Sequence, residues 1–208
     1  MELKHYLEYL QNTVVNKWDT LAMKDLDGDT SYTYGQMANE IARLHVTFRE
    51  LGIQEGDKIA LCGRNCANWG LTFLAIETYK AIAVSILPDF TAEGVHALVN
   101  HSEAKLLFVG DVVWENLDET AMPDLEGVIL LNDFSVLVSR NEKLTNARLN
   151  LNALFGNKFP MNFRKEHVSY YKDQPDEMLV LNYTSGSTGF SKGVMLPARS
   201  MWSNVEFG

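Results

Sequence analysis

The amino-acid sequence predicts an α/β fold in which helices cover a mostly parallel sheet. Short apolar runs, each the length of a buried strand, recur at intervals of about two dozen residues. The segments between them carry apolar residues at helical spacing. Strands that alternate with helices in this way need crossover connections, which make the strands parallel and cover both faces of the sheet. The expected strands are 58–62, 81–87, 105–109 and 127–131.

Two elements precede this alternation. Apolar side chains recur at helical spacing over residues 2–17, which predicts an amphipathic helix. The Asp27–Gly28 pair then separates two short runs, 21–26 and 30–34, and such a pair is typical of a turn between antiparallel strands. We therefore expect a hairpin after the first helix.

The helix that follows the hairpin has clear signals at both ends. Thr33 can cap its amino end, and Gln36, three residues later, completes a capping box. Gly52 follows the last turn, where a left-handed residue ends many helices. One apolar face is expected to consist of Met37, Ile41, Leu44, Phe48 and Leu51.

Further helices are expected between the strands, and the pattern becomes irregular after the fourth strand. Thr91 is a candidate cap for the second of these helices. Residues 132–176 contain polar runs and predict a connection with one or two poorly defined helices, before a compact strand over 177–183. The expected helices between the strands are 67–80, 92–101 and 112–120.

Composition and charge exclude several classes of protein. The 208 residues include 27 acidic and 18 basic side chains, and the formal net charge of −9 argues against binding to nucleic acid or anionic membranes. No run reaches the roughly 18 apolar residues of a transmembrane helix, and the first residues lack the pattern of a signal peptide. We therefore expect a cytoplasmic protein without a transmembrane segment.

The cysteine and histidine patterns do not predict a metal site. Cys62 and Cys66 are spaced C-x₃-C, and the sequence has no further cysteine to complete a zinc or iron–sulfur set. Glu93 and His96 form a single E-x-x-H pair, whereas a di-metal carboxylate site needs that pair twice. We interpret the cysteines as a strand end and turn, and the E-x-x-H pair as a solvated helix face.

The segment with the clearest chemistry is 183–193, which reads YTSGSTGFSKG. Its glycines permit close backbone approach and expose successive N–H groups to an anion. Lys192 adds a positive charge beside them. Hydroxyl groups that can donate to phosphate oxygens come from Thr184, Ser185, Ser187 and Thr188. Because strand-like apolar runs bracket the segment, we interpret it as a polyphosphate-binding loop rather than a flexible linker.

This loop differs from two common nucleotide-binding motifs. In a Walker A loop, G-x-x-x-x-G-K-[ST], a glycine precedes the lysine and a hydroxyl follows it. Here Gly186 is followed, after four residues, by Ser191–Lys192–Gly193, so both are missing. Residues 193–197 also predict a strand where a Walker A motif begins a helix. The sequence has no G-x-G-x-x-G, so it does not predict a Rossmann dinucleotide site.

The stretch YTSGSTGFSKGVML resembles the phosphate-binding signature of the adenylate-forming (AMP-binding) superfamily. That superfamily includes acyl-CoA synthetases, luciferases and peptide-synthetase adenylation domains. The order and spacing of GDKIAL, RNCANW and SEAKLLFVGD extend the resemblance over residues 33–205. Within the superfamily, the RNCANW–FLAI stretch is most similar to fatty acyl-CoA synthetases.

The sequence departs from the pattern of the superfamily in three places. Ser191 stands where the family usually has proline, and Ile82 stands where it usually has glycine. Pro197–Ala198 replaces the common Thr/Ser–His pair after the VML run. None of these changes removes a phosphate donor, so they indicate a divergent member with the same loop.

The resemblance implies a ligase reaction with ATP, Mg²⁺ and coenzyme A. A carboxylic acid, most simply a fatty acid, would react with MgATP to give an acyl-adenylate and pyrophosphate, and the acyl group would then pass to the thiol of coenzyme A. Lys192 would have a supporting catalytic role by neutralising phosphate charge. The residues that the resemblance assigns to the β- and γ-phosphates of ATP are Thr184, Ser185, Gly186, Ser187, Thr188, Gly189 and Lys192.

The resemblance also implies that residues 1–208 are an incomplete N-terminal AMP-binding domain. The adenine-binding segment, the Mg²⁺-associated glutamate, the ribose-binding aspartate and the adenylation lysine follow this loop in family members, as does the small C-terminal domain. We therefore expect the chain alone to be inactive, and surfaces that pack on the absent part to favour self-association.

Two other interpretations remain open. The chain could be a naturally short, non-catalytic nucleotide-binding or assembly module of the same fold. It could also be an unrelated α/β protein that acquired a phosphate loop independently, but the resemblance outside the loop argues against that interpretation. The abrupt end inside an expected helix favours an enzyme fragment, although Gly208 could act as a cap.

Overall fold

The structure is a computed structural model that describes residues 5–26, 28, 30–184 and 192–207. Its centre is a seven-stranded sheet with the strand order β7-β6-β5-β3-β4-β8-β9. The pairs among β6, β5, β3, β4 and β8 are parallel, whereas β7 and β9 add antiparallel edges. The strands are β3 (Lys58–Cys62), β4 (Ile82–Ile86), β5 (Leu106–Val109), β6 (Gly127–Leu130), β7 (Val136–Ser139), β8 (Met178–Thr184) and β9 (Lys192–Pro197). The predicted α/β fold with a mostly parallel sheet is confirmed.

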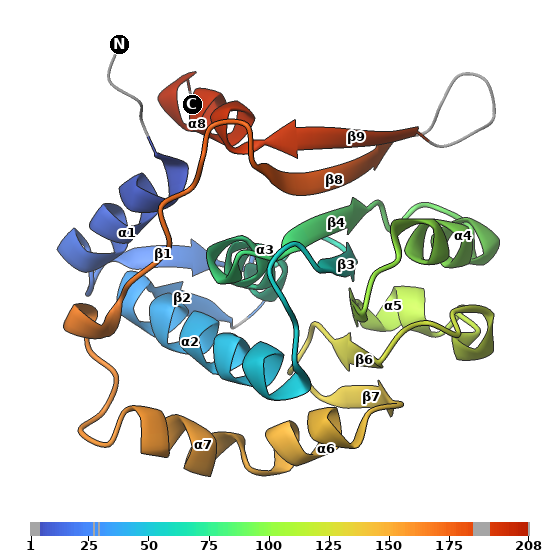
Figure 1. Ribbon diagram of the computed structural model, residues 1–208, viewed down its shortest axis with the longest axis horizontal. Coiled ribbons are helices and arrows are strands. Elements are labelled where there is room, and N and C mark those ends of the chain that lie inside the picture. Colours follow the sequence, from blue (N-terminus) through green and yellow to red (C-terminus); the bar gives the residue numbers. More distant parts are fainter. Residues whose placement is uncertain (1–4, 27, 29, 185–191, 208) are drawn as a thin grey trace.

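Helices cover both faces of this sheet because its inner strands are apolar on both sides. On β3, Ile59 and Leu61 pack with α2 (Tyr34–Leu51) and α3 (Ala67–Tyr79) in one core cluster. The alternate residues of β3 face a second cluster, which includes α4 (Ala92–Ser102). Figure 1 shows the β8–β9 pair at the top of the view and α6 (Glu142–Leu149) and α7 (Leu151–Lys158) at the bottom.

The amino-terminal elements form a small unit beside the sheet. Helix α1 (Tyr6–Asn16) lies within the predicted range 2–17, of which residues 2–4 are outside the described part of the chain. The predicted hairpin is confirmed as the antiparallel pair β1 (Leu21–Lys24) and β2 (Ser31–Thr33). A third apolar cluster joins α1 to β8 and to α8 (Ala198–Phe207).

The predicted ends of α2 are confirmed in detail. The Thr33 hydroxyl accepts from the Gln36 N–H, and the Gln36 side chain accepts from the Thr33 N–H. Gly52 ends the helix at φ = 89°, a left-handed conformation in which a side chain would be strained. Thr91 caps α4 as predicted, since its hydroxyl accepts from the Gly94 N–H.

Two predicted segments differ from the structure. The single helix predicted over 112–120 was wrong: a short α5 (Asp111–Trp114) is followed by a separate 3₁₀ turn, η1 (Glu119–Ala121). Asp118 interrupts the helix because its carboxylate accepts from the Thr120 N–H while its own N–H donates to the His96 ring. In the irregular region, where one or two helices were expected, the structure has α6 and α7, but edge strand β7 was not predicted.

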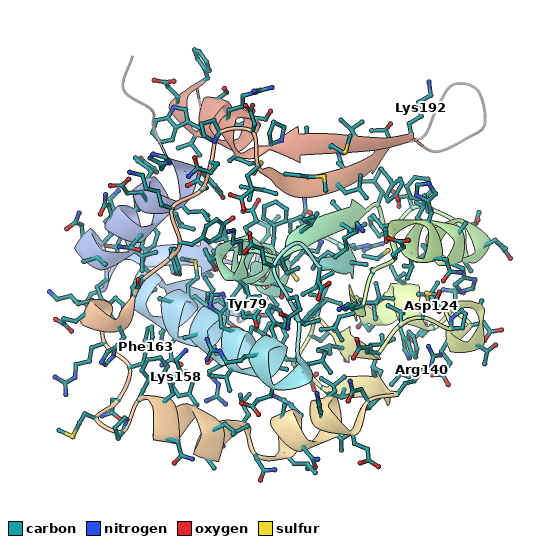
Figure 2. All side chains as sticks on the ribbon, in the orientation of Figure 1. Tyr79, Asp124, Arg140, Lys158, Phe163 and Lys192 are labelled. Carbon is teal, nitrogen blue, oxygen red and sulfur yellow. The ribbon has the colours of Figure 1, made fainter. Side chains whose placement is uncertain are left out.

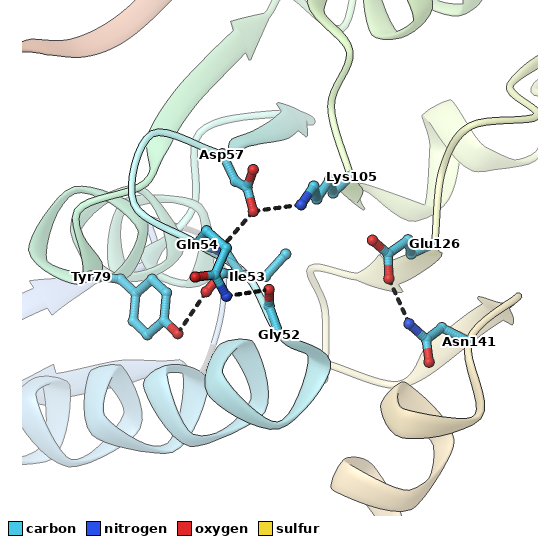
Figure 3. A network of polar contacts seen from close by, with 8 residues as sticks. All are labelled: Gly52, Ile53, Gln54, Asp57, Tyr79, Lys105, Glu126 and Asn141. Atoms are coloured by element: carbon cyan, nitrogen blue, oxygen red, sulfur yellow. Dashed lines mark hydrogen bonds and ion pairs between the residues drawn. The ribbon is translucent and has the colours of Figure 1, made fainter.

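A polar network fixes the amino ends of the parallel strands (Figure 3). The Asp57 carboxylate accepts from the Gln54 N–H at 2.6 Å and from Lys105 Nζ at 2.7 Å, which joins the loop before β3 to the start of β5. The Tyr79 hydroxyl of α3 donates to the Ile53 carbonyl at 3.1 Å. These contacts stabilise one edge of the sheet, and the opposite, carboxyl edge carries the candidate site.

Candidate functional site

The candidate site begins at the last described pair of residues of β8 and β9, at the carboxyl edge of the sheet. Thr184, the last residue of β8, pairs with Lys192, the first residue of β9, and Tyr183 pairs with Gly193 below them. The seven residues between Thr184 and Lys192 lie outside the described part of the chain. Five residues of the predicted site are therefore not described, namely Ser185, Gly186, Ser187, Thr188 and Gly189.

The strands on either side of this segment are those that the sequence predicted. The apolar run before the segment forms β8, and the lysine is followed by antiparallel β9 rather than by a helix. A Walker A lysine lies at the start of a helix, so this geometry agrees with the exclusion of that motif. Because β8 is parallel to β4, the segment begins at the same edge as the carboxyl ends of β3 to β6, where ligands bind in open α/β sheets.

Thr184 and Lys192 are both exposed and are available to a ligand. Within the described residues, neither side chain has a hydrogen bond or an ion pair. Figure 2 shows Lys192 pointing away from the sheet at the start of β9. A hydroxyl donor and an ammonium group at one strand pair suit an anionic oxygen ligand.

Tyr183, the residue before Thr184, anchors this end of the strand pair in the core. The ring is 1% exposed and belongs to the second core cluster, and its hydroxyl lies 2.7 Å from His101 Nδ1 in the last turn of α4. A Cβ atom on Gly193 would approach Tyr183 Cε1 to 3.2 Å, so glycine provides room for the ring. Burial raises the pKa of the Tyr183 hydroxyl above its ordinary value.

The cysteines and His96 have structural partners. Cys66 caps α3, since its Sγ accepts from the Trp69 N–H at 3.3 Å. Cys62 is buried, and burial raises the pKa of its thiol to about 12. His96 accepts from the Asp118 N–H, away from the Tyr183 contact of His101. Among the residues that the structure describes, no three Asp, Glu, His or Cys side chains converge as metal ligands.

A cavity of about 420 Å³ at the same carboxyl edge was not predicted. Gly63 after β3 and Gly110 after β5 lie close together beside this cavity. A Cβ atom on Gly63 would lie only 3.2 Å from the Gly110 nitrogen. The signal available in the sequence was a polar residue shortly after each parallel strand. Those lining residues are Arg64, Asp89, Asp111 and Asn132.

A sequence model described as "AMP-binding enzyme" matches residues 10–208 of the chain. The chain belongs to the AMP-binding enzyme family. The predicted resemblance is therefore confirmed. Within the described residues of this family member, no helix is long and apolar enough to cross a membrane.

Curated relatives include aryl- and acyl-CoA ligases. The chain is 28% identical over 183 residues to 4-coumarate–CoA ligase-like 9 of Oryza sativa subsp. japonica, covering 86% of the chain and 30% of the relative. It is 24% identical over 174 residues to long chain acyl-CoA synthetase 3 of Arabidopsis thaliana, covering 84% of the chain and 26% of that relative. The chain thus spans less than a third of the length of these relatives.

Solved structures support the fold of the family. A long-chain-fatty-acid–CoA ligase from Archaeoglobus fulgidus superposes with a TM-score of 0.70 and 17% identity, covering 95% of this chain and 38% of that one. A luciferase-like enzyme from the mealworm Zophobas morio superposes with a TM-score of 0.74 and 18% identity, covering 97% of this chain and 44% of that one. These likenesses establish the shared architecture of the N-terminal part.

Proposed function

We propose that this chain supplies the phosphate-binding part of an ATP-dependent carboxylate–CoA ligase. The observation that carries the proposal is the pairing of Thr184 with Lys192 at the mouth of the glycine- and hydroxyl-rich segment, at the carboxyl edge of the sheet. Both side chains lack competing partners among the described residues. In this interpretation they, and the segment between them, hold the β- and γ-phosphates of ATP.

The reaction begins with attack of a carboxylate oxygen on the α-phosphorus of ATP, which forms an acyl-adenylate and releases pyrophosphate. The thiol of coenzyme A then attacks the acyl carbon, forming the thioester and releasing AMP. Lys192 contributes by neutralising charge on the leaving pyrophosphate, and the glycine-rich backbone by orienting it for in-line displacement. Bound Mg²⁺ would supply further neutralisation of the phosphate oxygens.

For the acid, we propose a fatty acid. The relatives include long chain acyl-CoA synthetases from Arabidopsis thaliana and a long-chain-fatty-acid–CoA ligase from Rattus norvegicus, and the RNCANW–FLAI stretch resembles such enzymes. Exchange of radiolabelled pyrophosphate into ATP by the protein isolated from its source should require a fatty acid. Exchange that is supported by 4-coumarate and not by fatty acids would contradict this assignment.

We further propose that the 208-residue chain is a fragment that does not complete the adenylation reaction alone. The proposal rests on its coverage of less than a third of its curated relatives. The mass of the native product in source cells tests it, because a mass more than about twice 23.5 kDa is expected for a ligase of this family. A native product of 23.5 kDa would favour the short, non-catalytic module, and cytoplasmic location is expected for either.

Lys192→Ala is expected to weaken binding of MgATP to the 208-residue chain by roughly 10- to 100-fold, the range for loss of a charge-assisted contact. The melting temperature should be unchanged, because the Lys192 side chain has no partner in the described structure. Isothermal titration calorimetry measures the affinity. Lys165→Ala removes an exposed lysine far from the site and is the matched control. Equal affinities for the two variants would contradict the assigned role.

Self-association is expected from apolar side chains exposed on β9 and α8. Val194 and Met195 are 43% and 70% exposed, and Phe207 is 88% exposed. Such side chains favour contacts between copies when they are adjacent on an unpaired edge strand. Sedimentation velocity should therefore show dimers or larger species that Met195→Lys reduces. A monodisperse monomer that does not bind a hydrophobic dye would contradict this expectation.

A further inference from the structure

A contact between His101 of α4 and Tyr183 of β8 lies next to the candidate site. It suggests a role for a residue outside residues 184–192. Tyr183 lies one residue before Thr184 and is paired with Gly193, one residue after Lys192. The placement of the Thr184 and Lys192 side chains, and so the binding of any ligand between them, therefore depends on the orientation of the two strands at the Tyr183–Gly193 pair. Beyond this pair, the described part of the two strands consists of Thr184 and Lys192.

Tyr183 is held in two different ways. Its ring is 1% exposed, fills the space that Gly193 leaves and makes an edge contact with the His101 ring at a centroid distance of 5.8 Å. Its hydroxyl forms a hydrogen bond of 2.7 Å with His101 Nδ1. The packing could be satisfied by phenylalanine, but only the hydroxyl makes a directional contact with α4.

Helix α4 is a suitable anchor for such a contact. Thr91 caps its start, Glu103 ends it in a left-handed conformation, and its buried face packs into the second core cluster. The helix connects β4 to β5 and lies against the sheet near the carboxyl ends of the strands. Because β9 is the edge strand, the only strand beside the β8–β9 pair within the described sheet is β4.

We propose that His101, acting through the Tyr183 hydroxyl, is a positioning residue for the Thr184 and Lys192 side chains. The hydrogen bond fixes the direction of β8 at Thr184 and so the separation and orientation of the Thr184 and Lys192 donors. This inference rests on the proposed ATP-binding function but concerns a residue outside the loop. His101 does not contact the nucleotide in this proposal.

The test compares variants that separate the hydrogen bond from the packing. Tyr183→Phe keeps the ring and removes the hydroxyl, and His101→Ala removes the partner. His101→Asn places an amide atom at the same number of bonds from the backbone as Nδ1 and should restore the contact. His96→Ala changes a histidine on the same helix that faces Asp118 instead, and it is the matched control.

In the ligand-free chain, amide hydrogen exchange at residues 182–184 and 192–194 should accelerate roughly three- to tenfold in Tyr183→Phe and in His101→Ala. MgATP affinity, measured by calorimetry, should fall by a similar factor, with the melting temperature within about 4 °C of the unchanged protein. His101→Asn and His96→Ala should behave like the unchanged protein. The double variant should be no worse than either single variant, because both remove one contact.

The two proposals can fail separately. If the unchanged chain does not bind MgATP, the proposed function of this chain fails, and the hydrogen-exchange comparison still decides whether His101 orders the strand ends. If exchange at the strand ends is the same in Tyr183→Phe as in the unchanged chain, the positioning role is wrong. Faster exchange with unaltered MgATP affinity would also overturn it, because the contact would then be structural only.

Discussion

Phe108→Ala is expected to lower the free energy of unfolding by about 3–5 kcal/mol, the usual cost of truncating a fully buried phenylalanine. Phe108 lies on β5, at the centre of the sheet, and is 0% exposed. Its ring makes edge contacts with Phe48 of α2 at 6.1 Å and with Phe134 at 6.3 Å. The substitution would leave a cavity between the sheet and α2, which cannot close without moving several rings.

Equilibrium unfolding in urea measures this change. Phe207→Ala is the matched control, because Phe207 is 88% exposed and its truncation should cost less than about 0.5 kcal/mol. Phe108→Leu gives a smaller cavity and should lie between the two, which keeps the test valid if Phe108→Ala does not fold. If Phe108→Leu lowers the free energy of unfolding no more than Phe207→Ala does, packing of Phe108 between β5 and α2 does not contribute the expected stability.

Elements whose signals are local in the sequence were predicted accurately. The ends of α2 depend on hydrogen bonds between residues three apart, Thr33 and Gln36, and on one glycine that adopts a positive φ. The strands on both sides of residues 185–191 were predicted for the same reason. Their apolar runs are continuous, and the glycines, hydroxyls and lysine between them are adjacent along the chain.

Features that depend on contacts between distant residues were not predicted. The strand order places β3 between β4 and β5, and parallel partners of this kind leave no signal in a single sequence. The contact between His101 and Tyr183 joins residues 82 positions apart, and nothing in either local sequence identifies the partner. The predicted helix over 112–120 failed because Asp118 makes tertiary and local contacts that outweigh helical propensity.

A second large effect is expected from a buried carboxyl group, which should make stability depend on pH. Glu77 is 0% exposed near the end of α3, its Oε2 accepts from the Tyr6 hydroxyl at 3.1 Å, and its Oε1 has no partner in the described structure. The pKa of Glu77 is raised from 4.5 to about 8: burial is the main cause and the nearby Asp173 carboxylate adds to it, against the lowering effect of the Tyr6 hydrogen bond.

The sign of the pH effect follows from where the proton is bound. Between pH 4.5 and about 8 the folded protein keeps a proton on Glu77, whereas the unfolded chain has lost it. The contribution of this group to the free energy of unfolding therefore falls as pH rises through that range. Above about pH 8 the decrease is complete. The affected contact joins α3 to α1, so local opening of α1 should show the same dependence.

Glu77→Gln removes this titration while keeping an oxygen that can accept from Tyr6. The difference in free energy of unfolding between the variant and the unchanged protein should shift in favour of the variant by roughly 4 kcal/mol from pH 5 to pH 9. At pH 5 the variant should be slightly less stable than the unchanged protein, because its amide N–H groups lack partners. Urea unfolding at the two pH values measures the difference. Glu50→Gln, on the exposed face of α2, should give the same difference at both. If the Glu77→Gln difference is also independent of pH, the buried carboxyl group is ionised in the folded protein, and α1 is held against α3 by a charged rather than a neutral contact.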